Sequence, residues 1–393
     1  MKILHTSDWH IGHMLYGHDR TEEQQSMLDQ MVEIVAQEKP DVFILAGDVY
    51  DTSQPSAAAQ TMFNKTIIRL HDTHPDMTIV ATAGNHDSGS KHEIFRTPWE
   101  YLNVHTIGNL NKENPSSHII EIPEKGFVIA VPYTHERFLR DGLFQQLIDE
   151  VASRNTTQLP VILTAHTSIV GANFSGHENA TEKNIGGIDS VDVNNIGNGY
   201  DYLALGHIHK PQFIHTGKHN VRYSGTPIAI SFDEVKEHTV TLLEIHQHGE
   251  TLTESNFRFI PVHNPHPLTT IPEEGFAAWE HIKESLRNFP DDAPNYIRLN
   301  IKAGDIRKTE AFTEGNNIVN GKKCEILFIN IERATDGNEN HSRTQLTVEE
   351  LQQISPIEIA RLYAKDTGKV FDEDMEQLFI ETLQILNEEE REL

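Results

Sequence analysis

Five short clusters of histidine, aspartate and asparagine have residue types and spacing that could do chemistry. In chain order they are Asp8-Trp9-His10, Gly47-Asp48-Val49-Tyr50-Asp51, Gly84-Asn85-His86-Asp87, Ala165-His166-Thr167 and Gly206-His207-Ile208-His209. Imidazole nitrogens and carboxylate oxygens without cysteine favour Mn, Fe or Zn over a structural thiolate zinc site. The clusters therefore predict a metal site with nitrogen and oxygen ligands.

Each cluster taken alone also has an ordinary structural explanation. The chain has 24 histidines, so a single one such as His166 is more often structural than a ligand. A Gly-Asp pair after a strand can simply cap a helix, and Asn-His-Asp can form a turn. His207 and His209 have the same strand parity, yet a surface strand end would show the same pattern. The joint occurrence of five clusters, each at the end of an apolar run, favours a common site.

The elements that must position these clusters are short apolar runs. The runs lie at residues 42–46, 78–82, 161–164 and 202–205, and a strand is also expected before Asp8. Helical patterns alternate with them, which predicts an α/β sheet covered by helices. Thr21 and Gln24 predict a capping box at the start of the first helix. Functional groups gather at the carboxyl edge of such sheets, and we expect the glycines at 47, 84 and 206 to let the backbone turn there.

Composition narrows the classes of protein. The chain has 32 basic and 59 acidic residues and a net charge of −27, which excludes a simple basic nucleic-acid coat protein and argues against an anionic membrane as partner. A single cysteine, Cys324, cannot form an internal disulfide, so we expect a reducing cytosolic compartment. The N-terminus has too few apolar residues for a signal peptide, and no apolar run approaches the length of a spanning helix. We expect a soluble intracellular protein.

The patterns divide the 393 residues into three parts. Strand–helix alternation covers residues 1–262. After a break at 263–267, one helix and two strands predict a small α+β unit over 268–333. A polar stretch then leads to two amphipathic helices over 346–393, which either pack on the body of the protein or bind a partner.

The ordered clusters resemble the five motifs of the calcineurin-like metallophosphoesterase superfamily. Residues 2–12, 46–52, 84–88 and 202–211 are also similar to the SbcD family, the nuclease subunits of bacterial SbcCD. Residues 223–227 and the terminal helices extend this resemblance over nearly the whole chain. It implies a sandwich of mixed β-sheets flanked by helices as the nuclease domain (1–262), a capping domain that helps select DNA ends (268–333), and helices that bind an ATPase partner (346–393).

The resemblance also implies roles for single residues. One metal would be held by Asp8, His10, Asp48 and His209, and the other by Asp48, Asn85, His166 and His207. Asp48 would bridge, because a carboxylate has two oxygens. His86 would donate a proton to the leaving sugar oxygen, and Asp87 would orient an imidazole. Archaeal and eukaryotic relatives carry histidine where this chain has Asp51, so no second catalytic imidazole is expected there; Asp51 would support the site from outside the ligand set.

The implied activity is that of a two-metal phosphodiesterase, with two divalent ions, Mn2+ being the one expected. It would be a double-strand 3'–5' exonuclease and a single-strand or hairpin endonuclease in DNA replication, recombination and repair. The implied partners are DNA and an SbcC-like SMC ATPase, with a homodimer inside a heterotetramer. The location would be cytoplasmic, and nucleoid-associated when the protein is on DNA.

The charge and the motifs of the chain fit a nuclease subunit whose partner binds ATP and much of the DNA. An acidic chain should have weak DNA affinity of its own, because backbone binding depends on neutralised phosphates. Residues 315–323 fail the phosphate-loop pattern, so ATP binding would belong to the partner. Two alternatives share the motifs: a stand-alone metallophosphoesterase acting on nucleotides or other phosphodiesters, and a non-catalytic scaffold.

Overall fold

The computed structural model describes residues 1–134, 142–174, 190–214, 219–234 and 237–332, together with Met375. The chain divides into two compact units, Met1–Ala334 and Thr335–Leu393. Apart from Met375, the helices predicted over 346–393 lie outside the described residues.

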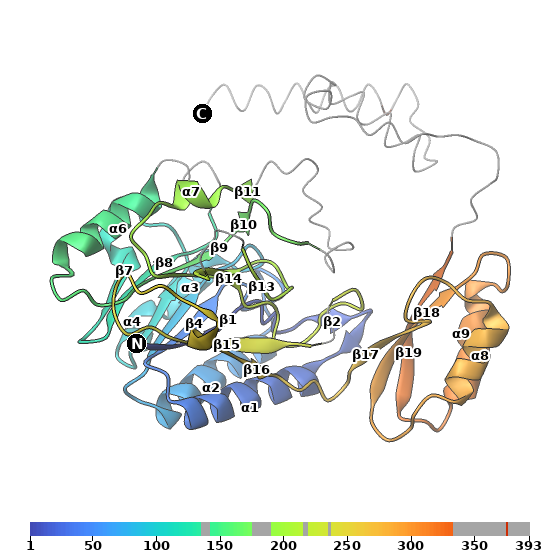
Figure 1. Ribbon diagram of the computed structural model, residues 1–393. Helices are drawn as coiled ribbons and strands as arrows, with labels where there is room; N and C mark the ends of the chain where they lie inside the picture. The colour runs from blue at the N-terminus through green and yellow to red at the C-terminus, as the bar shows by residue number, and fades with distance from the viewer. Residues whose placement is uncertain (135–141, 175–189, 215–218, 235–236, 333–374, 376–393) are drawn as a thin grey trace. The chain divides into compact units, whose positions relative to one another are not determined.

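Two six-stranded sheets are formed by the described residues of the first unit (Figure 1). The first sheet contains, in spatial order, β16 (Phe257–Pro261), β15 (Thr239–Glu244), β1 (Lys2–Thr6), β4 (Val42–Ala46), β5 (Thr78–Thr82) and β6 (Val104–Ile107). The second contains β13 (Gln212–Phe213), β14 (Val221–Tyr223), β12 (Tyr202–Gly206), β9 (Val161–His166), β8 (Gly126–Val131) and β7 (Ile119–Ile122). Central strands are parallel, while β15, β16, β13 and β7 pair antiparallel, so both sheets are mixed as expected.

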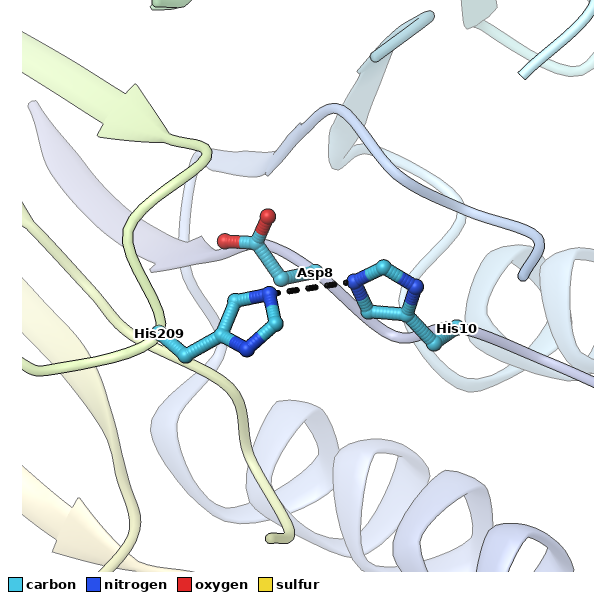
Figure 2. A group of neighbouring side chains, drawn as sticks. All are labelled: Asp8, His10 and His209. Atoms are coloured by element: carbon cyan, nitrogen blue, oxygen red, sulfur yellow. Dashed lines mark hydrogen bonds between the residues drawn. The ribbon is translucent and has the colours of Figure 1, made fainter. Parts of the chain in front are cut away.

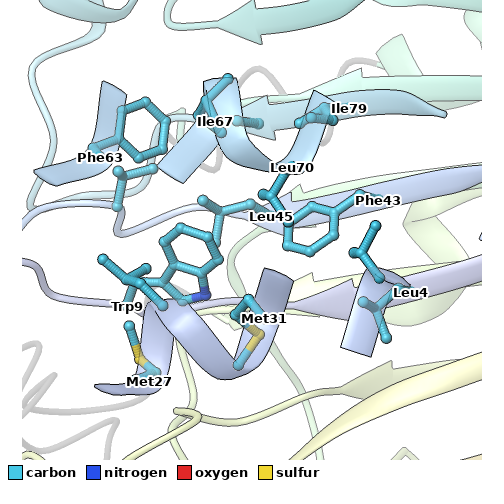
Figure 3. Close-up of a cluster of buried hydrophobic side chains, with 14 of the residues drawn as sticks. Leu4, Trp9, Met27, Met31, Phe43, Leu45, Phe63, Ile67, Leu70 and Ile79 are labelled. Carbon is cyan, nitrogen blue, oxygen red and sulfur yellow. The ribbon is translucent and has the colours of Figure 1, made fainter. Parts of the chain in front are cut away.

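Helices cover the outer faces of both sheets, which gives four layers (Figure 1). Leu4, Phe43 and Leu45 pack against the helices of the first sheet (Figure 3), whereas Ile3 and Ile44 face the second sheet. Strands buried on both faces are largely apolar, which explains the nearly continuous apolar runs in the sequence. The helices are α1 (Thr21–Glu38) and α2 (Ala57–Thr73) on the first sheet, α6 (Leu143–Arg154) on the second, and the short α3 (Gly89–Ile94), α4 (Arg96–Glu100) and α7 (Val193–Ile196).

The capping box predicted for the first helix is wrong. Helix α1 begins at Thr21 itself, and the preceding residue makes no side-chain cap. Asp19 Oδ1 instead accepts the Thr21 N–H at 2.7 Å. The Gln24 side chain accepts from the Gly12 N–H and donates to the His13 carbonyl, both at 3.0 Å. Gln24 thus ties α1 to the loop that carries the first motif.

The small unit, residues 268–331, is a three-stranded parallel sheet with two helices. Its elements are β17 (Leu268–Ile271), α8 (Trp279–Arg287), β18 (Asn295–Ile301), α9 (Lys308–Val319) and β19 (Cys324–Ile331). Sequence patterns predicted α8, β18 and β19 but not β17 or α9. Helix α9 contains Gly315, where a Cβ atom would lie 2.9 Å from Ile326 Cδ1, so glycine permits close packing on β19. Among the described residues, no helix combines the length and apolar character needed to cross a bilayer.

Candidate metal centre

The five motif clusters meet at the carboxyl ends of strands from both sheets. In the first sheet, β1 leads into Asp8 and His10, β4 into Asp48, and β5 into the segment 84–87. In the second sheet, β9 ends on His166 and β12 leads into His207. The sequence predicted a common edge, and the structure shows that two sheets supply it.

Trp9 anchors the loop that carries Asp8 and His10. Its indole is 1% exposed and packs edge-on against Phe43 and Phe63, with ring centroids 6.0 and 6.4 Å away (Figure 3). Asp8 and His10 have φ values of 54° and 43°, which few residues other than glycine adopt. Asp48 (φ 49°) and His207 (φ 97°) share this feature. Such strained backbone is typical of functional sites held by the surrounding fold.

The glycines at the sheet ends serve two different purposes. Gly47 has a φ of +84°, so it makes the sharp turn that the sequence predicted. Gly84 and Gly206 are not in that region; they are needed for close approach. A Cβ atom would lie 2.1 Å from Asp48 Oδ1 at Gly84 and 1.8 Å from the Ala46 carbonyl oxygen at Gly206.

Asp8, His10 and His209 form the first group of donor atoms (Figure 2). One ligand atom from each lies within 4.8 Å of the others. His10 Nε2 faces His209 Nε2 at 3.3 Å and lies 3.7 Å from Asp48 Oδ2. The other ring nitrogen of His10 is 3.5 Å from Asp51 Oδ1, so Asp51 contacts the imidazole from outside the group.

A second group contains Asp8, Asp48 and His166. His166 Nε2 lies 3.2 Å from Asp48 Oδ2 and 2.9 Å from Asn85 Oδ1. His166 Nδ1 donates to the Ala46 carbonyl at 2.9 Å, which directs Nε2 into the site. His207 Nδ1 lies 3.0 Å from the same Asn85 oxygen. Asp8 therefore belongs to both groups, and Asp48 of the second group lies near His10 of the first.

His86 and Asp48 belong to a third group with His10. The His86 N–H donates to Asp48 Oδ1 at 2.9 Å, and His86 Nδ1 donates to the Asp51 carbonyl at 2.8 Å. Because Nδ1 is held in this way, Nε2 is the ring atom available for exchange of a proton.

Asp87 lies beside the site but contacts backbone rather than a predicted ligand. Its Oδ2 accepts the N–H groups of Val49 (3.0 Å) and Gly84 (2.8 Å), and Oδ1 accepts that of Tyr50 (2.9 Å). A neighbouring imidazole, that of His92, has Nε2 3.6 Å from Asp87 Oδ2. Asp87 thus joins the loop after β4 to the loop after β5.

Burial and neighbouring charges shift the pKa values of this site. Burial raises the pKa of Asp8 to about 6. His166 opposes this shift, and the Asp48 carboxylate adds to it. Burial lowers the pKa of His10, but the neighbouring Asp51 and Asp48 carboxylates outweigh burial and raise the pKa to about 9. Burial also lowers the pKa of His166, but the Asp48 carboxylate outweighs burial and raises the pKa to about 9. Burial alone would raise the pKa of Asp48, but the nearby His166 outweighs burial and lowers the pKa.

These shifts agree with a site built for a cation. The raised pKa values of His10 and His166 favour their protonated forms beside the buried carboxylates, and a divalent cation would replace those protons on binding. Imidazole nitrogens that face one another across carboxylates, with an amide oxygen nearby, match the ligand preferences of Mn, Fe and Zn. The donor set therefore fits a divalent metal. The ligand roles of the individual residues stay predictions.

The structure brings all ten predicted site residues into this region, and it adds residues that sequence patterns did not reveal. Ser7 donates to Asp8 and lies 2.8 Å from the Ser224 hydroxyl. Glu234 Oε1 lies 3.0 Å from His209 Nδ1. Residues 223–227 were noted only for their resemblance, and Glu234 had no signal in the sequence, because its contact depends on the path of a loop.

Comparison with known proteins defines the class. The family model for calcineurin-like phosphoesterases matches residues 1–211. The chain therefore belongs to the calcineurin-like phosphoesterase family. With the grouped donor atoms, this membership indicates that the site binds divalent metal.

Individual relatives that match most of the chain define its family more narrowly. The chain is 30% identical to the D subunit of the nuclease SbcCD from Bacillus subtilis, over 99% of this chain and 100% of the relative. It is 28% identical to the protein of the same name from Escherichia coli K12, over 98% of each chain. The Rhodobacter capsulatus protein of that name is 30% identical over 73% of this chain and 75% of its own. These matches confirm the resemblance to the SbcD family.

Proposed function

We propose that this chain is the metal-dependent DNA nuclease subunit of a complex with an SbcC-like SMC ATPase. The observation that carries the proposal is the meeting of carboxylate and imidazole donors in overlapping groups at the ends of two sheets. The names of the full-length relatives support a nuclease rather than another phosphoesterase. The activity would comprise double-strand 3'–5' exonuclease and single-strand or hairpin endonuclease cleavage.

Two Mn2+ ions are the proposed cofactors. The first would be held by Asp8, His10, Asp48 and His209, and the second by Asp48, Asn85, His166 and His207. When bound, such a pair supplies an activated water and stabilises the charge that develops on the phosphoryl oxygens. The contacts of His166 with Asp48 and Asn85, and of His207 with Asn85, support the second set. The facing nitrogens of His10 and His209 support the first.

His86 is the proposed proton donor to the leaving sugar oxygen. Its Nδ1 is engaged by the Asp51 carbonyl, so a proton carried on Nε2 is the one that it can transfer. Its backbone N–H holds Asp48 Oδ1, which fixes the distance between the proton donor and the central carboxylate. Transfer of this kind contributes about 10²–10⁴-fold to rate.

The remaining parts have proposed roles in selecting DNA and binding the partner. The small unit would be the capping domain (268–333), and residues 346–393 would contact the ATPase. Residues 345–393 contain thirteen acidic and four basic side chains, a charge that disfavours binding to the DNA backbone. We propose a heterotetramer with two copies of each subunit and a cytoplasmic location, on the nucleoid when bound to DNA.

A substrate comparison tests the function. The purified chain, with and without the ATPase, is given Mn2+ and end-labelled linear duplex, hairpin DNA or a chromogenic phosphodiester. We expect metal-dependent cleavage of DNA, with ATP-dependent duplex degradation only in the complex. Cleavage of the chromogenic ester but not of DNA would favour a stand-alone phosphodiesterase. Metal binding without any cleavage would indicate a scaffold.

A further inference from the structure

Glu234 contacts the face of His209 that points away from the donor group. Its Oε1 lies 3.0 Å from His209 Nδ1, while His209 Nε2 faces His10. The Glu234 side chain is only 3% exposed. Its second oxygen, Oε2, accepts a hydrogen bond from the Thr226 hydroxyl at 2.8 Å. Both carboxylate oxygens are therefore held by contacts within the protein.

This arrangement determines which nitrogen of His209 can bind a metal. An ionised carboxylate only accepts hydrogen bonds, so Nδ1 of His209 must carry the hydrogen. In the neutral ring the lone pair is then on Nε2, the atom that faces His10. A carboxylate behind a metal-binding imidazole fixes both the tautomer and the ring orientation.

The two residues before Glu234 contact the small unit. Asp233 Oδ1 lies 2.5 Å from Arg298 Nη1 on β18. The Arg298 guanidinium also lies over the Phe232 ring, 5.5 Å from its centroid. Phe232 packs in a cluster with Leu15, Tyr296 and Leu327. Three consecutive residues thus contact β18 and β19 at one end and a predicted metal ligand at the other.

We propose that residues 232–234 are a positioning segment for the metal centre. Glu234 orients His209, and Phe232 and Asp233 fasten Glu234 to the small unit. The small unit therefore helps set metal affinity, although its own residues do not belong to the donor groups. This inference rests on the proposed role of His209 as a ligand.

Metal affinity without nucleic acid is the first test. Mn2+ binding to the full chain is measured by electron paramagnetic resonance for the wild type, Glu234→Ala and Glu234→Gln, and circular dichroism checks folding. We expect Glu234→Ala to bind one ion about 10–100-fold more weakly. Glu234→Gln should recover part of the loss, because an amide oxygen can still accept from Nδ1. Glu237→Ala, at an exposed position three residues after Glu234, should bind like the wild type.

A double-mutant cycle separates positioning from general destabilisation. In a His209→Ala background, Glu234→Ala should cause no further loss of affinity, because the ring that it orients is gone. A further loss of the same size would show that Glu234 acts on the fold at large, and would overturn the proposal. Wild-type affinity in Glu234→Ala itself would also overturn it.

Nitrogen-15 spectra of the histidine rings supply a readout that does not depend on metal. Signals of His209 are identified by their absence in His209→Ala. We expect the wild type to carry the hydrogen on Nδ1 and Glu234→Ala to lose this preference. Unchanged ring signals in Glu234→Ala would contradict the assignment.

The link to the small unit is tested with Asp233→Ala and Arg298→Ala. Each should weaken binding of the same ion, less than Glu234→Ala does, and the two changes together should have no more effect than one. Wild-type affinity in both would remove the small unit from the proposal. If the wild type binds Mn2+ and cleaves DNA while Glu234→Ala matches it in affinity, only this inference fails. If the wild type does neither, the proposed function fails first.

Discussion

Replacing Asp87 by asparagine should separate a structural role for this carboxylate from a catalytic one. The Asp87 side chain is fully buried and accepts three backbone N–H groups, from Val49, Tyr50 and Gly84. These groups belong to two loops that carry Asp48 and Asn85. Asp87→Asn keeps the shape of the side chain, but it removes the charge and replaces one acceptor oxygen with a donor.

The expected cost follows from the contacts. The amide NH2 group would take the Oδ1 position, because that position faces one backbone N–H and the other faces two. The Tyr50 N–H would then lose its acceptor, and the other two bonds would no longer be to a charged group. A hydrogen bond to a charged group is worth about 1.5–3 kcal/mol, and a buried unsatisfied donor costs about 1–3 kcal/mol. We therefore expect unfolding free energy to fall by about 2–4 kcal/mol.

Urea unfolding of the full chain without added metal, followed by circular dichroism, measures this loss. Asp76→Asn makes the same chemical change at an exposed position and should leave stability unchanged. Mn2+ affinity should fall along with stability in Asp87→Asn, because the two loops lose their common anchor. Wild-type stability combined with lost cleavage would refute this reasoning and support the role implied by the resemblance, in which Asp87 orients an imidazole.

Four further predictions concern metal binding, proton transfer, acid stability and the C-terminus. Asp48→Ala should lower metal content at both positions and abolish cleavage; two metals retained in elemental analysis would contradict a bridging role. His86→Gln should keep both metals and lose about 10²–10⁴-fold in turnover, measured in single-turnover DNA cleavage, and near-normal turnover would remove His86 from the mechanism. His5 is buried, and burial lowers its pKa from 6.5 to about 3, so its contribution to stability is complete above pH 6.5 and is lost as pH falls toward 3. Between pH 7 and pH 5 the wild type should therefore lose about 2 kcal/mol more in urea unfolding than His5→Gln, which can still bond to Tyr202; equal losses would refute this. Deleting residues 346–393 should leave a folded, metal-binding core that cleaves short single-stranded DNA but no longer co-purifies with the ATPase; unfolding of the core would show that this segment packs on it.

Much of the fold is readable in the sequence, because its signals are local. The runs at 42–46 and 78–82 match β4 and β5 residue for residue, since a strand buried on both faces is largely apolar. Trp9 between Asp8 and His10 is harder to interpret from sequence. In the structure its indole lies in the core, while Asp8 and His10 on either side face the site and have positive φ values.

The elements missed in the sequence have weak local signals. Helix α9 contains Gly315, a poor helix former whose value is its close packing on β19. The capping box at Thr21 and Gln24 was predicted from spacing alone. In the structure the Gln24 side chain instead forms hydrogen bonds to the backbone of Gly12 and His13, so it does not cap its own helix.

The sequence by itself determined which residues could bind metal and in which order they follow the strands, because residue type and position after an apolar run are local properties. Only the tertiary structure decided that two sheets share the site, that Asp87 joins two loops, and that Glu234 lies behind His209. Those features depend on how segments far apart in the chain approach one another. A carboxylate has the same local signal whether it binds metal, accepts backbone N–H groups or orients an imidazole, so only its neighbours in space can assign its role.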